Sequence, residues 1–61
     1  MDWVTFLQVM IEDEKAAMQK YEIAVDKADS EELRAVLEKL MKEEAFHIDF
    51  LEQEISRLQK K

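Results

Sequence analysis

The stretch Ala28-Asp29-Ser30-Glu31-Glu32-Leu33 decides the fold of this chain, because it separates two long amphipathic segments. Asp29 is followed three positions later by Glu32, which is the spacing of a capping box with Asp29 as the N-cap of a helix. Acidic residues in the first turn of that helix also suit the helix dipole. We therefore predict a tight turn near residues 28 and 29, built without Gly or Pro.

The segment before the turn has apolar residues at helical spacing. Its main stripe follows alternating steps of four and three residues and consists of Trp3, Leu7, Met10, Glu14, Ala17, Tyr21, Ala24 and Ala28. Asp2 precedes the stripe and is a predicted N-cap. A flanking apolar row makes the stripe wide enough for two neighbours, which is typical of a bundle. The pattern predicts a helix over residues 3–28.

The segment after the turn carries a similar stripe, which consists of Leu33, Leu37, Leu40, Glu44, His47, Leu51, Ile55 and Leu58. It predicts a second helix over residues 30–59. The predicted fold class is therefore all-α, with one antiparallel helical hairpin forming a single domain over residues 1–61. Two helices leave each apolar stripe half covered, so we expect two hairpins to pair as a four-helix bundle.

Composition narrows the choice of partners. A chain of 61 residues usually needs disulfides, a metal or a partner chain for stability, and this chain has no Cys. Its 15 acidic and 9 basic residues argue against a nucleic-acid partner. No apolar run approaches the roughly 20 residues of a membrane span, and no basic signal-peptide region begins the chain. We expect a soluble cytoplasmic protein without a membrane partner.

The polar members of the two stripes are candidate metal ligands. Glu44 and His47 form a Glu-x-x-His pair, but 10 of the 61 residues are Glu, so chance places one there about one time in six. Their position gives them more weight, because Glu14 is the only acidic residue of the first stripe. In an antiparallel hairpin with this turn, facing residue numbers sum to about 57 or 58. Glu14 and Glu44 then share one level, and His47 lies roughly 4.5 Å further along.

A two-fold axis at this level would bring four carboxylates and two imidazoles together. This is the ligand set of di-iron and di-manganese carboxylate bundles. Two divalent ions would balance four carboxylates that are costly to bury without metal. We predict two iron ions per dimer, held by Glu14, Glu44 and His47 of each chain, with manganese or zinc as alternatives. Tyr21 is either a hydrogen-bond partner of a ligand or a core aromatic residue.

These residues resemble the ferritin-like superfamily, in particular rubrerythrins and encapsulated ferritins. The resemblance rests on Glu14 with Tyr21 seven positions later, the acidic turn 29–33, and Glu43-Glu44-Ala45-Phe46-His47. It implies a ferritin-like bundle whose di-iron site oxidises Fe(II) with oxygen or peroxide, and Glu14, Glu44 and His47 would be the catalytic residues. It also implies an encapsulating shell or an external electron donor as a partner, with a location inside a protein compartment.

The chain also departs from these families. Rubrerythrins carry both helix pairs in one chain and usually a cysteine-bound iron, so a similar cycle here would need an external reductant. Ala17 stands where some half-repeats have a further carboxylate. The alternative function is a non-catalytic dimerisation or interaction module, in which Glu44 and His47 form a buried polar network without metal. A designed di-metal bundle would have the same site, although the irregular mix of Met, Phe and Trp favours a natural origin.

Overall fold

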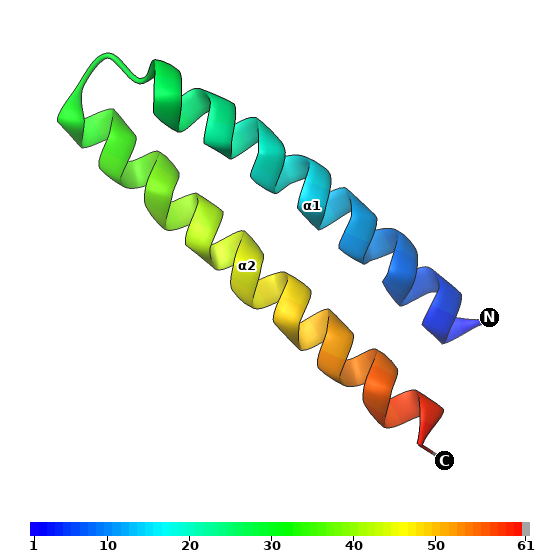
Figure 1. Cartoon of the computed structure of the whole chain (residues 1–61). Coiled ribbons are helices and arrows are strands. Elements are labelled where there is room, and N and C mark those ends of the chain that lie inside the picture. Colours follow the sequence, from blue (N-terminus) through cyan, green and yellow to red (C-terminus); the bar gives the residue numbers. More distant parts are fainter. Residues whose placement is uncertain (61) are drawn as a thin grey trace.

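The computed structural model describes residues 1–60 and contains two helices, α1 (Trp3–Lys27) and α2 (Glu31–Gln59). The helices run antiparallel, and both ends of the chain lie opposite the turn (Figure 1). The predicted helical hairpin is therefore confirmed, with each helix one residue shorter at the turn than expected. Lys61, the last residue of the predicted domain, lies outside the described residues.

The start of α1 is fixed by Asp2, as predicted. Its carboxylate accepts the backbone amide of Thr5 at 3.2 Å and the Thr5 hydroxyl at 2.7 Å. The amide is one of the N-terminal N–H groups that have no partner inside the helix. These two hydrogen bonds, the hydroxyl's first, hold the pKa of the Asp2 carboxyl below its ordinary value.

The start of α2 differs from the prediction by one residue. Ser30 is the N-cap, with extended backbone angles, and its Oγ accepts the amide of Leu33 at 3.1 Å. The prediction of Asp29 as N-cap was wrong, and so was the capping box, because the third residue after the true cap is the apolar Leu33. Glu31 and Glu32 do lie in the first turn of α2, where acidic side chains suit the helix dipole.

Arg34 ties the turn to the end of α1. Its Nε donates to the carbonyl of Val25 at 3.4 Å, and its Nη2 donates to the carbonyl of Ala28 at 3.2 Å. Its Nη1 donates to the carboxylate of Glu31. The last carbonyls of a helix lack partners inside the helix, so the guanidinium satisfies groups that would otherwise depend on water. No pattern in the sequence predicts this role of Arg34.

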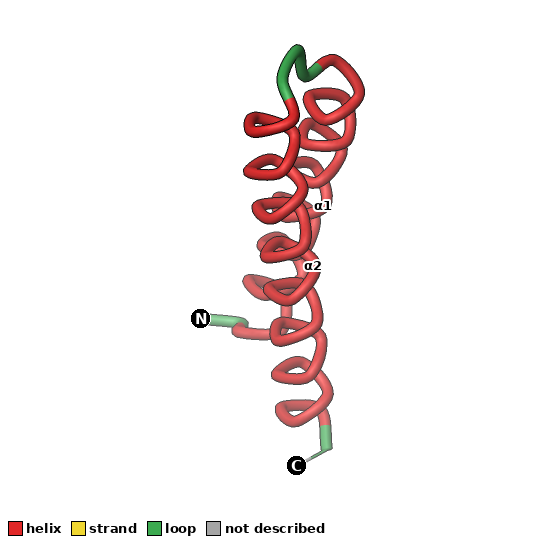
Figure 2. The backbone as a smooth tube through the Cα atoms, turned by 90° about the vertical axis from the view of Figure 1, so that its left-hand side faces the viewer, coloured by secondary structure: helices red, strands yellow, loops and turns green. Residues whose placement is uncertain are grey.

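The hairpin is long and thin. Its Cα atoms extend over 48 × 14 × 13 Å. In the view turned by 90°, α1 and α2 overlap along most of their length (Figure 2). Within residues 1–60, Ile11 is the only buried apolar residue. Two helices can cover only one side of each other, so the seam between them is the whole interior of a single chain.

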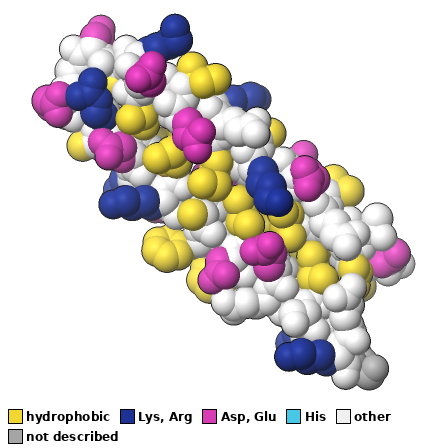
Figure 3. All heavy atoms as spheres, viewed as in Figure 1, with side chains coloured by type: hydrophobic (Ala, Val, Ile, Leu, Met, Phe, Trp, Pro, Cys, Tyr) yellow, Lys and Arg dark blue, Asp and Glu magenta, His cyan; other side chains and the backbone are white. Residues whose placement is uncertain are grey.

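Much of the apolar surface therefore stays exposed. On the face drawn in Figure 3, hydrophobic side chains follow the line between the helices, with charged side chains around them. The large exposed apolar residues are Met1, Trp3, Phe6, Val9, Ile23, Leu33, Val36, Phe46 and Phe50. Neither described helix combines the length and the apolar character that crossing a membrane requires.

Candidate metal site

Helical spacing brings the three predicted ligands together at the middle of the hairpin. Glu44 and His47 are three residues apart on α2, so their side chains share one face. Glu14 comes from α1 at the same level, because the two helices have the same rise per residue. One potential ligand atom from each residue lies within 4.8 Å of the other two. The three side chains therefore lie together at one level of the hairpin, as their positions in the sequence predict.

The distances in this cluster leave one oxygen without a hydrogen bond. His47 Nδ1 lies 3.5 Å from Glu14 Oε2 and 3.9 Å from Glu44 Oε1. The shorter contact is at the limit of hydrogen-bond length, and Glu14 Oε2 is buried without a hydrogen-bond partner among residues 1–60. An unsatisfied buried acceptor costs about 1–3 kcal/mol, so a water molecule or a second chain that donated to this atom, or a cation that bound it, would stabilise the hairpin.

The cluster is covered on one side and open on the other. The side chains of Glu14 and Glu44 are 21% and 17% exposed, whereas that of His47 is 53% exposed. The sequence predicts that His47 is buried in a bundle of two hairpins, and the structure of one chain does not test that burial. His47 lies at the margin of the seam, and nothing else in residues 1–60 covers that side.

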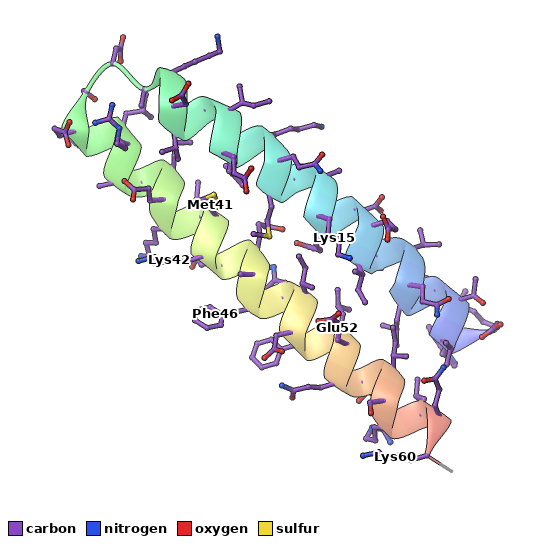
Figure 4. All side chains as sticks on the ribbon, viewed as in Figure 1. Lys15, Met41, Lys42, Phe46, Glu52 and Lys60 are labelled. Carbon is purple, nitrogen blue, oxygen red and sulfur yellow. The ribbon has the colours of Figure 1, made fainter. Side chains whose placement is uncertain are left out.

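Side chains close to Glu44 in sequence point in different directions. Met41 points toward α1, whereas Lys42 and Phe46 point away from it (Figure 4). Phe46 is consequently 62% exposed although it is a large apolar residue. Met41 thus lies on the side of the seam, and Phe46 places an uncovered aromatic ring on the outer side of α2.

The geometry of the three ligands suits one divalent ion. Oxygen and nitrogen ligands lie about 2.1 Å from such an ion, so two ligands of one ion are at most about 4.2 Å apart. Both approaches of His47 Nδ1, at 3.5 and 3.9 Å, are within that limit. The whole set, within 4.8 Å, has to close by less than about 1 Å. Carboxylate oxygens with one imidazole suit iron, manganese or zinc.

Tyr21 lies on α1, two turns from Glu14 in the direction of the turn, and is half-buried. The seven residues between them correspond to about 10 Å along the helix. Among residues 1–60 its hydroxyl makes no hydrogen bond. The structure of one chain does not bring Tyr21 into the cluster, and its predicted contact with a ligand stays a prediction about a second copy.

A shallow groove between the helices lies nearer the chain ends. It is lined by Gln8, Ile11, Glu52, Ile55, Ser56 and Gln59. None of these residues belongs to the cluster, and Glu14, Glu44 and His47 form the only group of three metal-ligating side chains within the described residues. The chemistry of the hairpin is therefore concentrated at its centre and not in the groove.

No protein-family model, curated protein or solved structure matches this chain. The ferritin-like assignment accordingly stays a prediction, and the function has to be inferred from Glu14, Glu44, His47 and their surroundings.

Proposed function

We propose that this chain is a ferritin-like protein that binds Fe(II) through Glu14, Glu44 and His47 and oxidises it with oxygen or peroxide. The observation that carries the proposal is the buried Oε2 of Glu14. It lies next to a second carboxylate and an imidazole, and it has no hydrogen-bond partner within residues 1–60. A divalent cation would satisfy this oxygen and neutralise both carboxylates at once.

The site is shared between two copies of the chain. Each copy supplies two carboxylates and one imidazole. The two negative charges of the carboxylates balance the charge of one divalent ion, and all three groups bind it. Two copies around a two-fold axis at the level of Glu14 and Glu44 would hold two ions in one four-helix bundle. The second copy would cover the exposed side of His47.

The residues of the chain have separate roles in this proposal. Glu14 and Glu44 lower the energy of the more highly charged Fe(III) product, because carboxylates stabilise the added positive charge. His47 completes the ligand set and leaves other positions on the ion open to the oxidant. Two Fe(II) ions together supply two electrons and become Fe(III). With two protons from solvent, these electrons reduce one hydrogen peroxide to two waters, or one oxygen to hydrogen peroxide. Tyr21 donates a hydrogen bond to a ligand of the partner subunit and so orients it.

The competing function is a metal-free interaction module in which His47 pairs with Glu14 and Glu44. The approach of His47 Nδ1 to both carboxylates is the observation that favours it. A buried polar network of this kind would set the register between two copies. The two functions differ in whether metal changes the melting temperature of the protein and whether the protein speeds the oxidation of Fe(II).

Binding and oxidation are best measured in two steps. Fe(II) is first added without oxygen while the melting temperature is followed, and air or peroxide is then admitted while near-ultraviolet absorbance is recorded. We expect Fe(II) to raise the melting temperature and the protein to oxidise Fe(II) faster than buffer does. His47→Ala should weaken both effects, and Tyr21→Phe should change the rate more than the binding.

Glu38→Gln is the matched control, because Glu38 is an exposed acid on the same helix outside the cluster. It should behave as the wild type in both steps. The metal function is refuted if Fe(II) changes neither melting temperature nor oxidation rate, or if His47→Ala equals Glu38→Gln. Binding without faster oxidation would leave a metal site and refute the ferroxidase activity.

A further inference from the structure

Three of the four methionines lie within about one helical turn of a proposed ligand. On α1, Met10 and Met18 stand four residues before and four residues after Glu14. On α2, Met41 stands three residues before Glu44. Side chains at these spacings share one face of a helix, with their Cβ atoms about 5–6 Å apart. All three methionines are half-buried, so their thioether sulfurs belong to the surroundings of the central cluster.

The three thioethers flank the cluster in both directions along the hairpin. Met10 is at the level of His47, because facing residue numbers sum to about 57 or 58. By the same rule, Met18 and Met41 lie within about 3 Å of one level, about one turn of helix from Glu14. Met41 points toward α1 (Figure 4). Helical side chains lean toward the N-terminus of their helix, which directs Met18 toward Glu14.

The other readily oxidised side chains lie further from the cluster. The chain has no Cys. Along α1, Tyr21 is about 10 Å and Trp3 about 16 Å from the level of Glu14. Met1 stands at the far end of the hairpin and is 86% exposed. Within residues 1–60, an oxidant that leaves the ligands therefore meets the three thioethers first, whereas an oxidant from solution meets Met1 first.

We propose that Met10, Met18 and Met41 act as a sacrificial reductant for hydrogen peroxide at the metal site. This inference rests on the proposed function, because the bound ion is what brings peroxide to these sulfurs. The substrate is peroxide that arrives after the bound Fe(II) has been oxidised. By reacting with it, the thioethers protect the ligands, among them the imidazole of His47.

The reaction is a two-electron oxygen transfer. A sulfur lone pair attacks one oxygen of hydrogen peroxide, so that an S–O bond forms and the O–O bond breaks. The other oxygen leaves as water with both protons of the peroxide. The sulfur loses two electrons and the peroxide gains two, so the iron keeps its oxidation state. The product is methionine sulfoxide, which cellular reductases convert back to methionine. Because a bound cation polarises an oxygen ligand, the transfer should be faster beside the site than in solution.

The order in which the four methionines are oxidised tests this proposal. The protein is loaded with Fe(II), oxidised in air and then given limiting hydrogen peroxide, and each sulfoxide is located by peptide mass spectrometry as a gain of about 16 Da. In metal-free protein with chelator, Met1 should be oxidised first because it is the most exposed. With iron, Met10, Met18 and Met41 should precede Met1. If Met1 is still oxidised first with iron, the proposal is overturned.

His47→Ala shows whether the ligand set directs the oxidation. With iron present, this variant should return to the order of the metal-free protein, with Met1 first. Glu38→Gln, an exposed change on the same helix, should keep the wild-type order with iron. A wild-type order in His47→Ala would mean that burial alone, and not the site, selects the three methionines, and it would overturn the proposal.

Replacing the sulfurs tests the protective role. The triple variant Met10→Leu, Met18→Leu and Met41→Leu keeps nearly the same side-chain volumes and should bind and first oxidise Fe(II) as the wild type does. Over repeated additions of peroxide it should lose its oxidation rate sooner, because the ligands are then attacked instead. Met18→Leu alone, the smallest change of packing, should lose its rate at an intermediate pace. Met1→Leu is the matched control and should decay as the wild type, so equal decay of the triple variant and Met1→Leu would overturn the protective role.

These outcomes separate the inference from the proposed function. A protein that oxidises Fe(II) faster than buffer but loses Met1 first would refute the sacrificial role and keep the ferroxidase activity. Oxidation of the three methionines ahead of Met1 without faster Fe(II) oxidation would keep the sacrificial role and refute the ferroxidase activity. A melting temperature that does not respond to Fe(II) would refute both, since no ion would then hold peroxide beside the sulfurs.

Discussion

The polar clusters at the turn and at the centre of the hairpin differ in whether one chain satisfies their hydrogen bonds. At the turn, Arg34 donates to the carbonyls of Val25 and Ala28 and to the carboxylate of Glu31. At the centre, Glu14 Oε2 is buried with no hydrogen-bond partner in the part of the chain that the structure describes. The turn cluster has a guanidinium with several donors, whereas the central cluster has four carboxylate oxygens and one imidazole. The balance of donors and acceptors therefore makes one cluster part of the fold and the other a candidate site for a cation.

The largest effect should come from supplying the missing cation. Mn(II), which is stable in air, should stabilise the wild type by about 3–4 kcal/mol at free concentrations of 100 to 1,000 times its Kd. Glu14→Leu should abolish this gain, because it removes the carboxylate contributed by α1. Thermal unfolding followed by circular dichroism, with Mn(II) and with chelator, measures the difference.

The same variant should be more stable than the wild type when metal is absent. Leucine fills a similar volume without a buried unsatisfied oxygen, so we expect a gain of about 1–2 kcal/mol. Glu12→Leu is the control, because Glu12 is exposed on the same helix. If Mn(II) stabilises Glu14→Leu as much as Glu12→Leu, Glu14 is not a ligand and the contrast between the two clusters is lost.

Disrupting the turn cluster should lower the stability of the hairpin, and this loss should not depend on metal. Arg34→Met keeps the aliphatic stem but leaves the carbonyls of Val25 and Ala28 without their donors. We expect a loss of about 1–3 kcal/mol, equal with and without metal. Denaturant unfolding in both conditions measures it. Arg57→Met removes a surface pair with Glu54 and should cost less, so an equal loss in the two variants would contradict the special role of Arg34.

The sequence predicts the hairpin and the position of the central cluster well, and the reason is geometric. Periodicity fixes which residues share a face, and the constant rise of both helices fixes the levels of Glu14 and Glu44. The role of Arg34 depends on the path of the turn, which no periodicity describes. The exposure of His47 depends on whether a second chain covers it, so the apolar stripe of one chain does not predict it.

The N-cap of α2 shows the limit of local patterns. Asp29 and Ser30 are both good N-caps, and a Glu lies three residues after Asp29, so spacing favoured Asp29. The hydrogen bond of Ser30 to the Leu33 amide shows that the helix begins one residue later. Which of the two neighbouring residues caps α2 depends on the backbone of the turn. Arg34 contacts that backbone by donating to the carbonyl of Ala28.

Ser30→Ala should therefore destabilise the hairpin by about 1 kcal/mol, because the Leu33 amide loses its acceptor. Asp29→Ala should have a much smaller effect, since its side chain caps nothing among the described residues. Chemical denaturation of both variants at one pH measures the two losses. A larger loss for Asp29→Ala would restore the capping box that the sequence suggested. Neither variant should alter the response to Mn(II), because both residues lie in the turn and not in the central cluster.

The smallest effect concerns Asp2, whose hydrogen bonds with Thr5 lower its pKa in the folded state. A lowered folded-state pKa means that the ionised carboxylate stabilises the fold above its ordinary pKa of 3.8 and that this contribution is lost as the pH falls through the folded-state value. The melting temperature of Asp2→Ala should therefore be below that of the wild type at pH 6, and the gap should narrow below about pH 4. Thr5→Val removes the hydroxyl donor and should raise the Asp2 pKa toward its ordinary value in an NMR titration. An unchanged pKa in that variant would mean that the hydroxyl does not hold the carboxylate and that backbone amides alone lower its pKa.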